Sequence, residues 1–315
     1  VYYLLSRYYG KEPAYLYFRG GSNGGREALV FIQRWPTEID GAIALYPFWN
    51  AVTAARTFGL QARALAKSDA YFTDEQMTLV YESSVATCDL LDGVEDGVIS
   101  NVRACAFDPG MLLCDKKRVD GCLNNSQLEV FQVFATDAFY PEMQGDAAMY
   151  PGFEVFGGAD LRPWLVGRQA PSSAVTPQMP LMFHYWDQLV RMAIAADPSF
   201  DTLSLDPRYP DELSERLHSV ARIIEARETD LSEFANSGGK LIIYHGLADA
   251  VLSPGATALF WERMTKTMGE DEVSQFAQYY EVPGLGHGLG AFIPVWDELS
   301  FLERWVEEGI RPTDE

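Results

Sequence analysis

The chain has 315 residues and a formal net charge of −21, from 45 acidic and 24 basic residues. A chain this acidic is a poor candidate for binding the phosphate backbone of nucleic acids. No uninterrupted apolar run approaches the roughly 18–20 residues that a membrane span requires, and no signal peptide is visible. The length allows a large buried core, in one large domain or two.

The first ten residues have the apolar spacing of an amphipathic helix already under way, and Gly10 and Pro13 end it. The sequence does not start with methionine. We therefore expect an N-terminal portion to be missing, and a further segment or a separate chain to complete the fold.

A glycine-rich turn between a strand and a helix is the most informative feature. Tyr15–Phe18 is a short aromatic run that predicts a strand, and a helix is expected from Arg26 onward. Between them, residues 20–24 read Gly-Gly-Ser-Asn-Gly and match the G-x-S-x-G pattern of a nucleophile elbow around Ser22. Such a turn strains the serine backbone, so neighbours without Cβ atoms are required. The alternative is a glycine-rich loop that happens to contain a serine.

A second buried strand is predicted over residues 41–47, which makes a strand–helix–strand unit and indicates a parallel sheet. From about 48 to 236 the pattern changes to helical segments, at 74–82 and 211–228, with cysteines and loops rich in proline and glycine. This stretch is typical of a large insertion rather than of a continued sheet.

Sheet character returns at residues 239–249, a strand that ends in Asp249. A helix is expected at 255–268 and a strand at 275–282. A glycine-rich turn containing His287 follows, and a last helix is expected from about 296 to 308.

Ser22, Asp249 and His287 occur in the chain order of α/β-hydrolase triads, each at or just beyond the end of a predicted strand. A serine hydroxyl needs a base to take its proton, and a buried carboxylate holds the imidazole in the right tautomer. Alternatively, Asp249 only closes a turn and His287 only occupies a loop. His245, four residues before Asp249, could line the pocket or support it.

Four cysteines, Cys88, Cys105, Cys114 and Cys122, lie within one 35-residue window. An even, clustered set favours local disulfides and an oxidising compartment. Zinc binding is the alternative, although no C-x-x-C pair or nearby histidine supports it.

The segment from Cys88 to Val98 alternates carboxylates with glycines in a compact loop. Asp89, Asp92 and Asp96 suit a hard cation that takes side-chain and main-chain oxygens, although the spacing is not that of an EF-hand. A solvated acidic turn is the alternative.

Together these residues resemble the tannase/feruloyl esterase family of α/β-hydrolases, over nearly the whole chain. The segments that carry the resemblance are 21–26, 36–44, 88–98, 244–249 and 283–287. The resemblance implies an α/β-hydrolase core with an inserted lid that binds a structural calcium ion. It implies the carboxylates of Asp89, Asp92 and Asp96 and the carbonyls of Val94 and Val98 as ligands, and it pairs Cys88 with Cys105 and Cys114 with Cys122.

The sequence departs from the family at two places. The family joins cysteines next to the nucleophile and next to the histidine, and Gly21 and Gly288 stand there instead. We therefore expect open space beside Ser22, and a Gly21→Cys, Gly288→Cys variant that oxidises readily. Strands that precede this stretch in the family, and with them one oxyanion-hole amide, have no counterpart here. The other amide would be that of Asn23.

The sequence thus predicts a catalytic domain from residues 1–54 and 237–315, and a lid over residues 55–236. The resemblance implies a secreted serine esterase acting on small aromatic esters of feruloyl, galloyl or terephthaloyl type. His245, Leu252 and Trp186 are candidates for the substrate pocket. Acyl transfer, or the forming and opening of lactones, is an alternative activity, and a non-catalytic calcium-binding relative is another.

Overall fold

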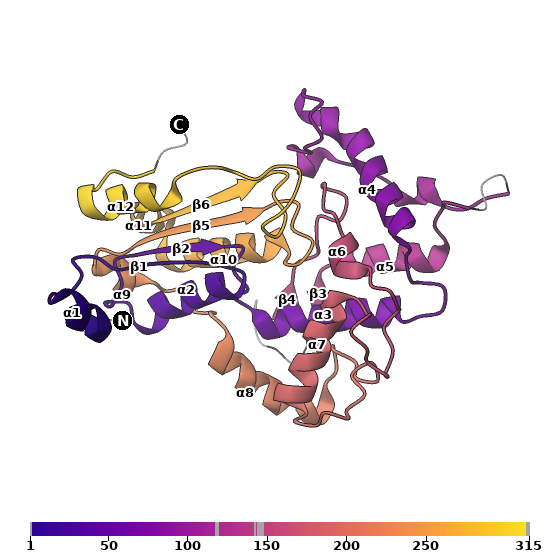
Figure 1. Ribbon diagram of the computed structural model, residues 1–315, viewed down its shortest axis with the longest axis horizontal. Helices are drawn as coiled ribbons and strands as arrows, with labels where there is room; N and C mark the ends of the chain where they lie inside the picture. Colours follow the sequence, from indigo (N-terminus) through magenta and orange to yellow (C-terminus); the bar gives the residue numbers. More distant parts are fainter. Residues whose placement is uncertain (1, 117–119, 142, 144–147, 313–315) are drawn as a thin grey trace.

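The computed structural model describes residues 2–116, 120–141, 143 and 148–312. Within this part of the chain the main sheet has four strands, in the order β1-β2-β5-β6 (Figure 1). They are β1 (Tyr17–Gly21), β2 (Gly41–Leu45), β5 (Lys240–Gly246) and β6 (Ala277–Val282). All neighbouring strands pair in parallel, so their carboxyl ends meet at one edge of the sheet. The predicted α/β architecture is confirmed.

Helices cover both faces of the sheet because its central strands are buried on both sides. Ala42 and Ile243 belong to a cluster with residues of α2 (Asn23–Arg34) and α10 (Pro254–Met268). Ile43 and Ile242, which point to the opposite face, cluster with Leu302 and Trp305 of α12 (Glu298–Glu308). Three shorter helices belong to the same part of the molecule: α1 (Tyr2–Tyr9), α9 (Ser232–Asn236) and α11 (Glu270–Phe276).

Several boundaries differ from those expected from the sequence. The strand expected at Tyr15–Phe18 is β1 and continues through Gly20 and Gly21, because these residues pair with Ala44 and Leu45 of β2. The last helix begins at Glu298 rather than near 296, where the Asp297 side chain accepts a hydrogen bond from the Ser300 amide and caps it.

The segment between β2 and β5 forms a helical lid that lies beyond the carboxyl edge of the sheet (Figure 1). The helix expected at 74–82 extends to Cys88, and the one expected at 211–228 ends at Ile224. The helices of the lid are α3 (Ala51–Leu65), α4 (Asp74–Cys88), α5 (Asn125–Ala135), α6 (Arg162–Leu165), α7 (Leu181–Gln188) and α8 (Ser214–Ile224). A π-helical turn (Leu189–Ile194) continues α7. The lid also has 3-10 turns at Asp89–Asp92, Val102–Ala104, Pro109–Leu112 and Asp211–Leu213, and a small antiparallel pair, β3 (Ala138–Phe139) and β4 (Met149–Tyr150).

Helix α3 is buried along almost its whole length and carries the predicted domain boundary at residues 54 and 55. It contacts α5, α7 and α8, all of which belong to the lid. At the other boundary, Phe234 of α9 packs in the sheet's own apolar cluster. No helix in the described ranges is both long and apolar enough to cross a membrane.

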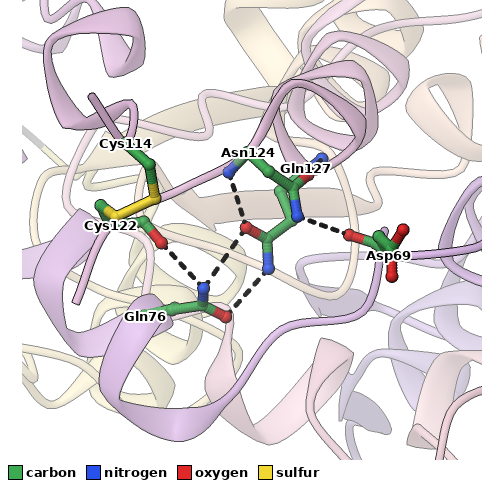
Figure 2. The surroundings of a disulfide bond; sticks show 6 residues. All are labelled: Asp69, Gln76, Cys114, Cys122, Asn124 and Gln127. Atoms are coloured by element: carbon green, nitrogen blue, oxygen red, sulfur yellow. Dashed lines mark hydrogen bonds between the residues drawn. A yellow bond between two sulfur atoms is a disulfide. The ribbon is translucent and has the colours of Figure 1, made fainter. Parts of the chain in front are cut away.

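Two disulfides lie in the lid, Cys88–Cys105 and Cys114–Cys122, with the pairing that the family resemblance implies. Figure 2 shows that the second lies beside the starts of α4 and α5, near Gln76 and Asn124. Gln76 and Gln127 complete the capping boxes of α4 and α5, and their side-chain amides hydrogen-bond to each other at 2.9 Å. Gln76 also donates to the Cys122 carbonyl at 2.9 Å, so two helix N-termini and one disulfide form a single unit (Figure 2).

Candidate active site

Ser22 lies in the turn between β1 and α2 and has the strained backbone of an elbow, with φ 59° and ψ −118°. Its amide donates to the Leu45 carbonyl at 3.0 Å, which ties the turn to the end of β2. A Cβ atom at Gly20 would lie 2.5 Å from the Gly24 carbonyl, and one at Gly25 would lie 2.6 Å from the Leu45 carbonyl oxygen. The glycines therefore let strand and helix pass at a distance that no side chain allows, as the sequence pattern predicts.

Asp249 and His287 are brought together by the turns that follow β5 and β6. His287 Nδ1 lies 2.9 Å from Asp249 Oδ2. The other carboxylate oxygen, Oδ1, accepts hydrogen bonds from the amides of Val251 and Leu252. Because both oxygens are held, the carboxylate is fixed in place and can in turn fix the orientation of the imidazole.

A second imidazole supports the same carboxylate. His245 Nε2 lies 3.1 Å from Asp249 Oδ2, and its Nδ1 lies 2.7 Å from the Thr257 hydroxyl. Burial by itself would raise the pKa of Asp249, but hydrogen bonds from His245 and His287 outweigh burial and hold that pKa well below its ordinary value. Asp249 is therefore an anion between two imidazoles.

Tyr46, directly after β2, was not identified as a site residue from the sequence. Its ring centroid lies 4.5 Å from that of His287. Cβ atoms built at Gly21 and Gly288 would lie 3.0 and 3.2 Å from its hydroxyl oxygen. The open space expected beside Ser22 is thus filled, and cysteines placed at these two glycines would clash with Tyr46. The only sequence signal was its place at a strand end, where sheet edges carry functional residues.

A cavity of about 390 Å³ opens beside His287, between the lid and the turns after β5 and β6. The lid contributes aromatic and charged side chains, and the core contributes mainly small and apolar ones. Among its lining residues are Tyr81, Arg162, Trp164, Leu181, Val251 and His287. Their separation in the sequence explains why the sequence alone identifies only His287 of this group as a site residue.

Arg162, which lines the cavity, forms an ion pair with a carboxylate of the lid. Arg162 makes two hydrogen bonds to Asp160, of 2.8 and 2.7 Å, and a third of 2.9 Å to the Thr78 hydroxyl. Burial opposes ionisation of Asp160, but Arg162 outweighs it and lowers the pKa of that carboxyl. The charged residues on this wall therefore neutralise each other.

The structure corrects the three candidates for the substrate pocket. Trp186 is fully buried inside the lid, where its indole N–H donates to the Thr202 carbonyl at 3.2 Å. His245 is fully buried as well, and its ring is used to hold Asp249. Leu252 is 4% exposed and packs in the apolar cluster of the lid. None of the three lines the cavity beside His287; Val251, next to Leu252, does.

The acidic loop of the lid is folded around its own backbone. Asp89 accepts hydrogen bonds from the Gly97 amide, Asp92 from the Val94 and Ser100 amides, and Asp96 from the Val98 amide. Oxygen donors of this kind suit calcium. In the described part of the chain, however, no three His, Cys, Asp or Glu side chains converge closely enough to hold a metal ion.

Comparison with known proteins places the chain in a family. The family model for tannase and feruloyl esterase matches residues 1–315. The chain belongs to this family. An esterase of Agrobacterium fabrum that is named as uncharacterised is 32% identical over 99% of the chain. The mono(2-hydroxyethyl) terephthalate hydrolase of Piscinibacter sakaiensis is 30% identical over 98% of it.

Solved structures of the tannase and feruloyl esterase family share the fold. Feruloyl esterase B of Aspergillus oryzae superposes with a TM-score of 0.82 over 99% of the chain and 63% of its own, at 22% identity. Tannin acyl hydrolase from Aspergillus niger gives 0.72 over 98% of the chain and 60% of its own. The chain spans 58% of the length of each of the two bacterial relatives. These matches lend no support to the expected separate chain.

Proposed function

We propose that this protein is a serine hydrolase that cleaves carboxylic esters of aromatic acids. The observation that carries the proposal is the hydrogen bond between Asp249 and His287 at the edge where the strained Ser22 turn also lies. The names of relatives matched over nearly the whole chain, esterases and a terephthalate ester hydrolase, support the same reaction class.

The proposed roles follow from which atoms are already bonded. Since Nδ1 of His287 faces Asp249, Nε2 is the nitrogen left to take the proton of Ser22. Ser22 Oγ attacks the ester carbonyl carbon, and an acyl-enzyme forms as the protonated imidazole gives its proton to the departing alcohol. Water then attacks the acyl-enzyme with His287 again acting as the base, and Ser22 is regenerated.

Asn23 is the first residue of α2, so its amide is one of the four at a helix N-terminus without a partner inside the helix. Negative charge that develops on the ester oxygen is stabilised there by the amide and by the helix dipole. We propose this amide as one oxyanion-hole donor, as the sequence predicts.

The cavity beside His287 supports an uncharged aromatic acyl group. Tyr81 offers a partly exposed aromatic ring and Leu181 an exposed apolar side chain, while Arg162 is paired with Asp160 and the pair adds no net charge. Feruloyl and galloyl groups, whose polar substituents are neutral phenols and methoxy groups, suit this wall better than a terephthaloyl group with its free carboxylate.

The test is labelling with a fluorophosphonate together with hydrolysis of methyl ferulate and methyl gallate. We expect stoichiometric labelling at Ser22, and Ser22→Ala should lose several orders of magnitude in kcat with an unchanged melting temperature. Ser253→Ala, a change at a buried serine outside the triad, is the control for the loss of a hydroxyl. Activity of Ser22→Ala within tenfold of the parent would refute the assignment.

We also propose that the lid binds a structural calcium ion through Asp89, Asp92 and Asp96 and the carbonyls of Val94 and Val98. Each carboxylate in this loop already has an orientation set by a backbone amide, and calcium takes carboxylate and main-chain carbonyl oxygens together. The two disulfides support secretion into an oxidising compartment.

A further inference from the structure

Tyr46 stands between the loop of the candidate nucleophile and the loop of the candidate base. Ideal Cβ atoms at Gly21 and Gly288 both come within 3.2 Å of its hydroxyl oxygen. One glycine directly precedes Ser22, and the other directly follows His287. The same side chain therefore touches the neighbour of each residue, and its ring lies against the imidazole itself, at 4.5 Å between centroids.

The backbone of Tyr46 is strained in a way that aims the ring at this position. Its φ is 32°, a positive value that few residues with side chains adopt. Its amide donates to the Tyr244 carbonyl at 2.8 Å, which anchors the residue to β5. Strain at a non-glycine residue persists where surrounding contacts enforce it, commonly at functional sites.

We infer that Tyr46 is a positioning residue, whose ring holds His287 at its working distance from Ser22 where no covalent bond joins the two loops. The inference rests on the proposed function. Glycine at positions 21 and 288 is then explained by the tyrosine, since a Cβ at Gly21 would lie 2.9–3.1 Å from three atoms of its side chain.

The geometry also says what could replace the ring. The two Cβ positions each lie within 3.2 Å of the same oxygen atom, which is compatible with the Cβ–Cβ distance of about 3.5–4.5 Å in a disulfide. Shortening Tyr46 removes the oxygen atom that both positions approach. A disulfide between cysteines at positions 21 and 288 is therefore expected only in a variant that lacks the tyrosine side chain.

The first experiment compares Tyr46→Ala with Tyr46→Phe. Loss of the ring removes one support of the imidazole beside its bond to Asp249, and a displacement of about 1 Å can reduce turnover by about 10²-fold. We expect kcat of Tyr46→Ala to fall by about that factor while KM changes less than about threefold. Tyr46→Phe keeps the ring and should retain kcat within about threefold. An equal loss in both variants would overturn the role of the ring.

Tyr279→Ala is the matched control, since Tyr279 is also partly buried on the sheet but packs on Trp261, with 5.7 Å between ring centroids. This variant should lower the melting temperature without slowing the fluorophosphonate reaction at Ser22. If Tyr279→Ala slows that reaction as much as Tyr46→Ala does, the effect of Tyr46 is only structural, and the inference is wrong.

The deciding experiment adds Gly21→Cys and Gly288→Cys to Tyr46→Ala and to the parent. We expect a disulfide in the triple variant, detected by mass spectrometry, and at least a tenfold recovery of kcat that reduction reverses. The recovery should be incomplete because Gly288 has φ 75°, which cysteine adopts with strain. No disulfide in the triple variant, or a disulfide without recovery, would refute the inference.

Disulfide formation is measured without an assay of enzyme activity, so it tests the geometry separately from the proposed reaction. If the parent protein is not labelled at Ser22 although the disulfide forms in the triple variant, the proposed function fails and the contact geometry stands. If the parent is labelled and Tyr46→Ala is labelled equally fast, the positioning role fails and the proposed function stands.

Discussion

The candidate site and the lid are built differently. At the edge of the sheet, Ser22, Tyr46 and Asp249 each follow a parallel strand, and backbone pairing sets their relative positions. In the lid, the starts of α4 and α5 are joined by glutamine side chains, one of which also bonds to the carbonyl of a disulfide cysteine (Figure 2). Sheet pairing fixes many residues at once, whereas each tie in the lid fixes only a local junction.

This difference teaches where the protein tolerates change. At the sheet edge, one carboxylate holds His287 and is itself held by two backbone amides and a second imidazole. We expect a small change there to act directly on the proposed reaction. The lid shapes the cavity through Arg162 and Trp164, so we expect its loosening to reduce stability and substrate binding more than the chemical step.

The largest effect is expected from Asp249→Asn. An amide in place of the carboxylate can stabilise the wrong tautomer of His287, and loss of this role in a triad reduces kcat by about 10⁴-fold. Steady-state hydrolysis of a p-nitrophenyl ester measures it. Asp297→Asn is the matched control, because asparagine also caps a helix N-terminus and Asp297 caps α12 without lining the cavity. A loss below tenfold in Asp249→Asn would contradict the proposed triad.

The same carboxylate sets a pH dependence of stability. Since the pKa of Asp249 in the folded protein is lowered, its ionised form stabilises the fold fully above the unfolded value of about 3.9. This contribution is lost as the pH falls from there toward the lowered pKa. Urea unfolding of Asp249→Asn should therefore depend less on pH below about 4 than that of the parent. An unchanged acid dependence would contradict this.

A smaller effect, confined to the lid, is expected from Cys88→Ser with Cys105→Ser. The bond closes a sequence separation of 17 residues, and a loop of about that length contributes about 3 kcal/mol to the free energy of unfolding. Hydrogen exchange should show faster exchange in α4 and unchanged protection in β5, while kcat stays within about threefold. Reduction of the parent is a useful check, because all four cysteines lie in the lid. Equal loss of protection in both regions would show that lid and sheet unfold together.

The smallest effect is expected from calcium removal. Chelation leaves the carboxylates of Asp89, Asp92 and Asp96 to repel one another in one loop, so the melting temperature should fall by a few degrees and recover when calcium is added. Asp96→Asn should weaken the response. Asp108→Asn is the control, since Asp108 also accepts a hydrogen bond from a lid amide but lies outside the loop. A melting temperature that neither chelator nor calcium changes would count against the site.

The sequence by itself determined the parts of this protein that depend on local backbone chemistry. The glycines around Ser22 predict a turn that other residues cannot make, and the strand patterns predict that Asp249 and His287 lie at the same edge of the sheet. Resemblance over five short segments identified the family and the disulfide pairs. Strand and helix ends were less accurate, as at Gly20 and Gly21, because pairing with β2 decides them.

Only the tertiary structure decided what surrounds those residues. Arg162 and Trp164 reach the cavity from the lid, and Trp186 does not, because helix packing determines which side of each lid helix faces inward. His245 supports Asp249 and does not line the pocket, because its ring is buried and bonds to Asp249 and to Thr257 of α10. The contact of Tyr46 with both Gly21 and Gly288 joins three segments that are distant in the chain. A glycine in a sequence does not indicate which side chain will occupy the space beside it.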